Sequence, residues 1–134
     1  MPLVRIDVIE GRSDTELAGI GAAVQQALIT CFGVPERDRF QVITEHRRDR
    51  LVYDPAYLDV ERTDGIVMVQ VVFSRGRSKE QKQAFYALVA KGIAERTGTR
   101  PQDVVVVLVE NDREDWSFGN GVAQYLTMPR EEWR

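Results

Sequence analysis

The sequence is poor in the residues that build disulfides and metal centres. Its 134 residues include one cysteine, Cys31, and one histidine, His46. A lone cysteine excludes an internal disulfide. A lone histidine, with no cysteine nearby and no Asp/Glu cluster at ligand spacing, excludes the usual site of three or four metal ligands. We expect no metal ion, and we interpret Cys31 as a buried helix residue rather than a nucleophile.

Long hydrophobic runs and a strong charge of one sign are also absent. No run approaches the ~20 apolar residues that span a bilayer. Arg5 and Asp7 interrupt the short N-terminal stretch that would have to be apolar in a signal peptide. The formal net charge is −3, and the one basic cluster, residues 46–50, has acidic neighbours. We therefore expect a cytoplasmic protein with neither a membrane nor a nucleic-acid partner.

The composition that remains is that of one domain covering residues 1–134. A chain of this length with 43% hydrophobic residues can bury one core and leaves little room for a second. Apolar residues alternate with charged ones from Val4 to Val8, which predicts a strand with one buried side. A second strand is predicted over residues 38–44, which are rich in β-branched and aromatic side chains.

A helix is predicted between these two strands. Ser13 followed by Glu16 is the pattern of a capping box, and Gly33 and Pro35 mark the helix end. The apolar residues between these limits recur at helical spacing, at Leu17, Ile20, Val24, Leu28 and Cys31. The first part of the chain, residues 2–46, is therefore a predicted β-α-β unit.

The same unit recurs 65 positions later, over residues 65–111. The capping pattern returns as Ser78 with Gln81, and Asp103 stands where the first copy has Asp38. Self-similarity of this kind indicates two equivalent units that share a core. The apolar positions correspond as well: Val4, Ile6 and Val8 with Val69, Val71 and Phe73, and Ile20, Val24 and Leu28 with Phe85, Val89 and Ile93.

The predicted fold class is α/β (α+β), with two tandem β-α-β units that form a four-stranded mixed sheet under two helices. Residues 47–64 are the linker between the units. Residues 112–134 form a C-terminal segment that begins in polar, glycine-containing sequence around Trp116 and Phe118. We expect the tail from residue 122 onward to add a short strand.

This topology predicts which residues meet. Strands in a right-handed β-α-β unit are parallel, so Pro2 and Asp38 should lie at one edge of the sheet. If a pseudo-twofold relates the two units, the third strand runs antiparallel to the first and ends at that edge. Arg75 and Arg77 then approach Pro2; a parallel arrangement of the units would separate these residues.

These residues form a chemically sensible group. Removal of Met1 would expose the secondary amine of Pro2, which can act as a base, an acid or a nucleophile toward carbonyls. Arginine binds carboxylates bidentately, so Arg75 and Arg77 predict a small carboxylate substrate. Asp38 could hydrogen-bond the prolyl ammonium or a water molecule.

Each of these residues also has an ordinary structural interpretation. Proline after the first methionine is common, Asp38 could simply open a strand, and the two arginines could be surface charges. Two arginines beside a helix N-terminus are electrostatically unfavourable, however, and this favours an anion site there. Trp116 and Phe118 are as compatible with core packing as with a pocket wall.

Several motifs resemble known families. Residues 2–14, Pro-Leu-Val-Arg-Ile-Asp-Val-Ile-Glu-Gly-Arg-Ser-Asp, resemble the N-terminus of 4-oxalocrotonate tautomerase and its relatives. Four further motifs, in order along nearly the whole chain, resemble the malonate semialdehyde decarboxylase family of the tautomerase superfamily. They are residues 33–41 (Gly-Val-Pro-Glu-Arg-Asp-Arg-Phe-Gln), 44–47 (Thr-Glu-His-Arg), 74–82 (Ser-Arg-Gly-Arg-Ser-Lys-Glu-Gln-Lys) and 115–119 (Asp-Trp-Ser-Phe-Gly).

The resemblance implies a cofactor-independent homotrimer. The implied catalytic residues are Pro2, Asp38, Arg75 and Arg77, and Trp116 and Phe118 would line the pocket. One position departs from the family pattern: Gly76 stands between the arginines where the decarboxylases have proline, which gives this loop more conformational freedom.

The leading functional prediction is decarboxylation of a small 3-oxo acid such as malonate semialdehyde, with Pro2 as a cationic or iminium-forming catalyst. The first alternative is a keto-enol tautomerase or hydratase of small 2-oxo or unsaturated acids that uses the same residues. The second is a trimeric binding protein without catalysis, since a fold does not fix an activity.

Overall fold

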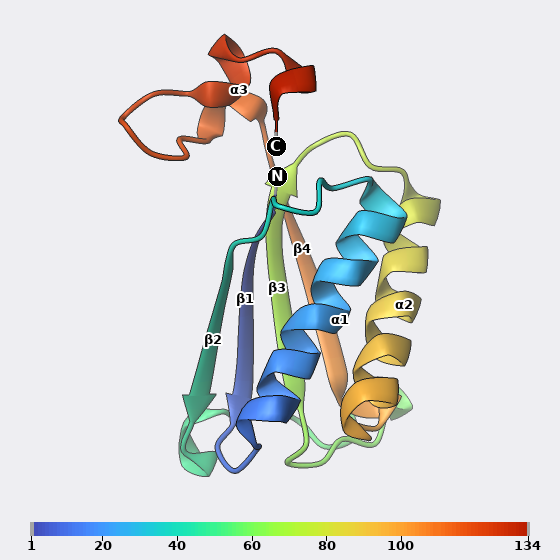
Figure 1. Cartoon of the computed structure of the whole chain (residues 1–134). Helices are drawn as coiled ribbons and strands as arrows, with labels where there is room; N and C mark the ends of the chain where they lie inside the picture. Colours follow the sequence, from blue (N-terminus) through green and yellow to red (C-terminus); the bar gives the residue numbers. More distant parts are fainter. Residues whose placement is uncertain (1, 134) are drawn as a thin grey trace.

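Two β-α-β units build a four-stranded sheet with strand order β2-β1-β3-β4. The computed structural model describes residues 2–133. Figure 1 shows both long helices on one face of this sheet. The elements are β1 (Pro2–Ile9), α1 (Asp14–Phe32), β2 (Gln41–His46), β3 (Val67–Ser74), α2 (Lys79–Thr97), β4 (Val104–Asn111) and α3 (Gln124–Thr127), with short 3-10 turns at Arg48–Arg50, Tyr57–Asp59, Pro101–Asp103, Arg113–Asp115 and Arg130–Glu132.

The two units are structural copies of one another. Strand β3 and helix α2 begin and end 65 positions after β1 and α1. The residues that connect strand to helix match as well, because Gly11 and Gly76 have φ of 120° and 123°. Both helices end at a glycine in the left-handed conformation, Gly33 and Gly98. The predicted duplication of a β-α-β unit is confirmed.

Strand pairing fixes the relative direction of the units. Strands β1 and β2 are parallel, and so are β3 and β4. The central pair, β1 and β3, is antiparallel, with Pro2 opposite Phe73. This mixed sheet is the predicted one, and it brings the start of β1 and the end of β3 to the same edge.

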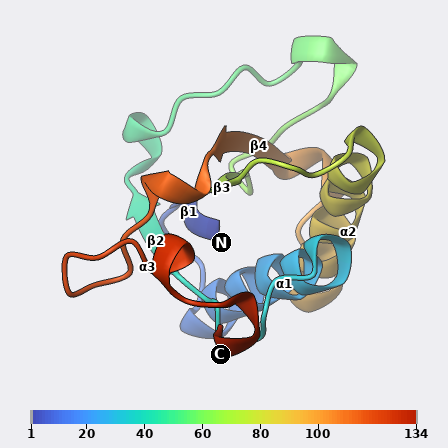
Figure 2. The same ribbon diagram turned by 90° about the horizontal axis from the view of Figure 1, so that it is seen from above.

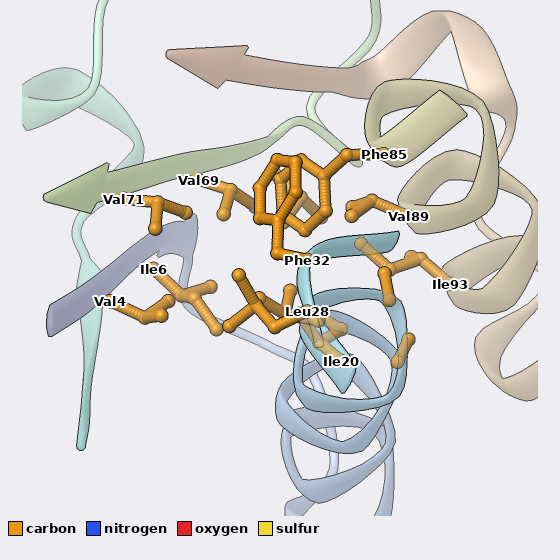
Figure 3. Packing of buried hydrophobic residues seen from close by; sticks show 14 of the residues in the cluster. Val4, Ile6, Ile20, Leu28, Phe32, Val69, Val71, Phe85, Val89 and Ile93 are labelled. Carbon is orange, nitrogen blue, oxygen red and sulfur yellow. The ribbon is translucent and has the colours of Figure 1, made fainter. Parts of the chain in front are cut away.

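The core lies between the helices and the inner face of the sheet. Figure 3 shows valines and isoleucines of β1 and β3 packed against α1 and α2. Phe32, at the end of α1, stacks on both Phe73 and Phe85, with ring centroids 5.4 and 4.9 Å away. Cys31 is only half-buried and packs against the rim of this core. Apolar residues on alternate strand positions therefore bury both units together.

The predicted capping boxes differ in outcome. In α2, the Ser78 hydroxyl accepts from the Gln81 N–H and the Gln81 side chain accepts from the Ser78 N–H, so the box is complete. In α1 the Ser13 hydroxyl accepts from the Glu16 N–H at 3.1 Å. The Glu16 carboxylate, however, binds Arg12 at 3.2 Å, so only half of the predicted box forms there.

Two predicted strands need correction. The second strand begins at Gln41 instead of Asp38, because residues after Pro35 form a turn in which the Asp38 N–H donates to the Pro35 carbonyl at 3.0 Å. No strand forms within residues 122–133, where the chain makes α3 and a 3-10 turn. There the Gln124 side chain bonds the Phe118 N–H and the Gly119 carbonyl, which closes a loop instead of an extended segment.

The linker and the open face of the sheet complete the molecule. Figure 2 shows the linker, residues 47–64, extending on the side of the sheet away from the helices. Its Arg47 and Arg48 form exposed ion pairs with Asp49 and Asp64, as expected of a solvated loop. No helix within residues 2–133 has both the length and the apolar composition needed to cross a membrane.

Candidate functional site

The predicted site residues approach one end of the sheet. Pro2 opens β1, and the Val4 N–H donates to the Phe40 carbonyl at 2.9 Å, which places the turn containing Asp38 beside it. Arg75 and Arg77 follow directly on the end of β3, whose Phe73 is paired with Pro2. The C-terminal segment folds over this same end, where Figure 1 places both chain termini.

Two adjoining cavities lie under the C-terminal segment, with volumes of about 260 and about 160 Å³. Asp38 and Tyr125 line both. Pro2 is buried in β1 and is not a lining residue of either cavity. The larger cavity is lined by Pro35, Arg37, Asp38, Phe40, Phe118, Gln124, Tyr125, Met128, Glu132 and Trp133. The smaller is lined by Gly33, Val34, Pro35, Asp38, Arg77, Tyr125, Arg130 and Trp133.

Asp38 is held in a turn, and one of its carboxylate oxygens has no hydrogen-bond partner among residues 2–133. Its carbonyl accepts a hydrogen bond of 3.2 Å from the side chain of Gln25, a residue 6% exposed on α1. Its Oδ1 is buried and has no hydrogen-bond partner among residues 2–133. Burial raises the pKa of Asp38 to about 6, and the positive N-terminus opposes this shift less strongly. Gln25 was not predicted; a glutamine among apolar helix positions is its only sequence signal.

Arg77 points into the smaller cavity. Its guanidinium carbon lies 5.6 Å from the centre of the Phe32 ring. Its Nε is buried and finds no hydrogen-bond partner within the described residues. Burial lowers the pKa of Arg77, and the positive charge of Arg130 lowers it further. A partly buried guanidinium whose Nε donor is free is suited to an anion.

Arg75 has different surroundings. Its side chain is exposed, and its Nε binds the Asp112 carboxylate at 3.0 Å. This hydrogen bond raises the pKa of Arg75. Arg75 lines neither cavity. The structure therefore brings Asp38 and Arg77 together and places Arg75 outside them.

Gly76 lies between the two arginines. Its φ is 123°, a value that proline, fixed near −65°, cannot adopt. The loop between the two arginines therefore follows a path that is closed to a loop with proline at this position.

The two predicted aromatic residues form one stack. The Trp116 ring lies parallel to that of Phe118, with centroids 5.6 Å apart, and its Nε1 donates to Asn111 at 2.8 Å. Phe118 lines the larger cavity, whereas Trp116 lies behind it. Phe118 also packs edge-on against Tyr125 at 5.0 Å.

Three residues that line the smaller cavity come from the tail and were not predicted: Tyr125, Arg130 and Trp133. The ring of Trp133 lies 4.3 Å from that of Tyr125 and 6.0 Å from the Arg130 guanidinium. Burial raises the pKa of Tyr125, and the charge of Asp38 raises it further. Tyr125 and Trp133 are the aromatic residues of the tail, and this is the signal that sequence analysis could have used.

The opposite end of the sheet provides an internal comparison. The repeat counterparts of Asp38 and Arg77 are Asp103 and Arg12, and these two also line one pocket. Both have hydrogen-bond partners there, and neither has a buried side-chain atom without a partner among residues 2–133. Asp103 accepts two bonds of 2.6 Å from Thr63, and Arg12 donates to Glu16, Thr99 and the Gly65 carbonyl. The repeat therefore uses the same residue types as an anchor at one end and leaves them unpaired at the other.

Known proteins share this sequence and arrangement. Two family profiles, each described as a tautomerase enzyme, match residues 38–119 and residues 2–59. The probable tautomerase YusQ of Bacillus subtilis (strain 168) is 41% identical over 126 residues, which cover 94% of this chain and 99% of that protein. The chain belongs to the tautomerase superfamily. It is therefore a member of an enzyme superfamily, and Asp38 and Arg77, with their unpaired buried atoms, lie at the end of the sheet where Pro2 begins β1.

Solved structures resemble this tautomerase closely. A malonate semialdehyde decarboxylase, described as having decarboxylase and hydratase activities, is 38% identical with a TM-score of 0.88, and the match covers 93% of this chain and 96% of that one. A fused 4-oxalocrotonate tautomerase trimer, 19% identical with a TM-score of 0.74 over 90% of this chain and 94% of that one, shares the fold. The predicted tautomerase-like fold is confirmed.

Proposed function

We propose that this tautomerase-superfamily enzyme decarboxylates a small 3-oxo acid such as malonate semialdehyde, with the amine of Pro2 as its catalytic group. The observation that carries the proposal is the contrast between the two ends of the sheet. Asp38 and Arg77 keep buried polar atoms unpaired at the end where Pro2 begins β1, whereas their counterparts are satisfied. The 38% identity to a malonate semialdehyde decarboxylase supports the reaction type.

The proposed chemistry requires removal of Met1, which frees the secondary amine of Pro2. Arg77 binds the substrate carboxylate while the amine condenses with the aldehyde, releasing water and forming an iminium ion. The carbon–carboxylate bond then breaks, carbon dioxide leaves, and its electron pair moves into the iminium to give an enamine. Protonation at carbon and hydrolysis release acetaldehyde and restore the amine.

Asp38 has the role of orienting Pro2 and water. A carboxyl group with a pKa of about 6 is partly protonated near neutral pH, so it can both accept and donate a proton. Its free Oδ1 is the atom available for the prolyl ammonium or for the water that hydrolyses the enamine product.

Arg75 has the role of a second, outer contact to the carboxylate. Its bond to Asp112 joins two exposed side chains, 61% and 56% accessible. Exposed ion pairs of this kind contribute about 0–1 kcal/mol, so a substrate carboxylate can compete with Asp112 for the guanidinium. Trp116 supports Phe118 from behind, and Phe118 excludes water from the larger cavity.

The alternative function is a tautomerase or hydratase acting on small 2-oxo or unsaturated acids. Two relatives, YusQ and the 39% identical YrdN of Bacillus subtilis (strain 168), are named probable tautomerases, and this favours the alternative. In that reaction neutral Pro2 takes a proton from the enol oxygen and returns one to carbon. Asp38 and the arginines keep the same positions.

One experiment separates these functions. We would compare kcat/KM for malonate semialdehyde and for phenylenolpyruvate in the wild type, Pro2→Ala and Pro55→Ala, with Met1 removal verified by mass spectrometry. Pro55 is an exposed linker proline and serves as the matched control. Proline-dependent release of acetaldehyde and carbon dioxide supports decarboxylation. Proline-dependent ketonisation with negligible decarboxylation supports the alternative, and equal rates in Pro2→Ala and wild type would rule out both.

We also propose that the enzyme is a homotrimer. The sheet face without helices exposes Val42 on β2 and Val107 and Val109 on β4, which are 40–52% accessible, and exposed apolar side chains of this kind can be covered when subunits associate. A fused 4-oxalocrotonate tautomerase with this fold is described as a trimer. Light scattering coupled to size-exclusion chromatography is expected to give three times the chain mass, and Val107→Lys is expected to lower it.

A further inference from the structure

We propose that Arg130, in the C-terminal segment, is a specificity-determining residue that binds the substrate carboxylate together with Arg77. The inference deepens the proposed function and rests on it for the identity of the substrate. It adds a cation that the sequence motifs do not include. The C-terminal segment thereby becomes part of the binding site instead of only its cover.

The first observation is that both guanidinium groups line one small cavity. Arg77 comes from the loop after β3, and Arg130 comes from the 3-10 turn Arg130–Glu132. The cavity of about 160 Å³ is large enough for a carboxylate and a short carbon chain. Among residues 2–133, neither arginine forms an ion pair, although Asp38 lines the same cavity.

The second observation is that both cations are held by aromatic rings. Arg77 lies over Phe32 at 5.6 Å and Arg130 over Trp133 at 6.0 Å. Stacking on a ring orients a guanidinium plane while leaving its N–H groups free at the edges. Arg77 retains one such buried donor, its Nε, without a partner in the described structure.

The charges around the cavity favour an anion. The groups that act on Arg77 from the packed elements are Arg130, Tyr125 and Arg113, and both arginines lower its pKa. Two nearby guanidinium groups repel one another, and an anion between them removes that repulsion. A carboxylate matches the paired donors of both groups.

Arg113 provides the matched control. Its guanidinium also lies over the Trp133 ring, at 5.8 Å, on the same chain segment. It lines neither cavity, so it shares the charge and the aromatic contact of Arg130 but not the access to the ligand. A general effect of charge near the site would affect both arginines alike.

The test measures binding of 3-hydroxypropionate, an unreactive analogue that keeps the carboxylate and chain length of the proposed substrate. Calorimetric titration of the full-length protein is expected to show binding weakened about 10-fold in Arg130→Gln and in Arg77→Gln, and within twofold of wild type in Arg113→Gln. Arg130→Lys should restore part of the affinity. The neutral amide, 3-hydroxypropionamide, should bind wild type and Arg130→Gln equally, because only the carboxylate uses this residue.

Clear results would overturn the inference. Wild-type affinity in Arg130→Gln, an equal loss in Arg113→Gln, or no saturable binding to the wild type would each do so. Turnover separates this outcome from the proposed function: Arg130→Gln should raise KM with kcat nearly unchanged. If Pro2→Ala leaves turnover intact while carboxylate binding still needs Arg130, the reaction proposal fails and the binding site stands.

Discussion

Asp38 and Arg77, which belong to different β-α-β repeats, line one cavity, and each has a buried polar atom without a partner among residues 2–133. Leaving such atoms unpaired costs ~1–3 kcal/mol each, so they persist where function requires them. Their counterparts Asp103 and Arg12, at the other end of the sheet, form five side-chain hydrogen bonds with their surroundings. This contrast leads to opposite expectations for equivalent substitutions.

Asp38→Asn and Asp103→Asn are expected to change stability in opposite directions. Asp103 is 2% exposed and bound twice by Thr63, so its replacement should destabilise by about 2–3 kcal/mol. Folding raises the pKa of Asp38 from 3.8 to about 6, so between these pH values the folded protein binds more protons than the unfolded chain. The free energy of unfolding therefore falls as the pH rises through this range, and the full cost of the charged carboxylate is present above pH 6. Asp38→Asn should therefore stabilise by about 1 kcal/mol at pH 8, a value reduced for partial exposure, and by nothing below pH 4.

Urea unfolding of both variants at pH 4 and pH 8 measures these changes. Activity provides the second readout, since Asp38→Asn should lose turnover while Asp103→Asn retains it at temperatures where it is folded. Stabilisation by Asp38→Asn that is the same at both pH values would contradict the assigned cause.

Arg77→Gln is expected to lower kcat/KM about 10–100-fold, because it removes a buried charge-assisted hydrogen bond to the carboxylate. Arg75→Gln should lower it less, by about 3–10-fold, because Arg75 lies outside the cavity and is shared with Asp112. Lys79→Gln, an exposed cation two residues beyond Arg77, is the control. Equal losses at both arginines would mean that Arg75 moves into the cavity when substrate binds.

Gly76→Ala and Gly11→Ala are expected to cost similar stability but different activity. Both glycines have φ near 120°, where a side chain is strained, and an added Cβ meets no atom within 4 Å at either position. Each substitution should destabilise by about 1–3 kcal/mol in thermal unfolding. Only Gly76→Ala should reduce kcat/KM, since only that loop carries Arg75 and Arg77. Equal kcat/KM values in Gly76→Ala and Gly11→Ala would mean that the geometry of the Gly76 loop does not affect catalysis.

Phe118→Ala is expected to raise KM and to destabilise by about 1–2 kcal/mol, because it opens the larger cavity and removes the stacking with Trp116. Tyr86→Ala is the control, since Tyr86 is a 39% exposed aromatic residue that packs edge-on against Phe85 on α2. Steady-state kinetics and chemical unfolding measure the two effects. An unchanged KM in Phe118→Ala would show that this side chain does not contact the substrate.

Local patterns in the sequence determined the elements and their duplication. Alternation predicted β1, the serine caps predicted the starts of α1 and α2, and Gly33 predicted the end of α1, because these signals depend on residues close together in the chain. Local patterns failed where a hydrogen bond closed a turn or a loop in place of an extended strand. The turn after Pro35 delayed β2 to Gln41, and the Gln124 side chain closed a loop in the tail.

Only the tertiary structure decided which equivalent residues are free. Asp38 and Asp103 occupy the same repeat position, yet Thr63 of the linker satisfies one and no described residue satisfies Oδ1 of the other. The sequence placed Asp38, Arg75 and Arg77 at one sheet edge, but Arg75 binds Asp112 and lies outside the cavity that the other two line. The return of the C-terminal segment brings Arg130 and Tyr125 to the same cavity. Contacts between side chains that are far apart in the sequence depend on how the elements pack, and no local sequence pattern encodes this packing.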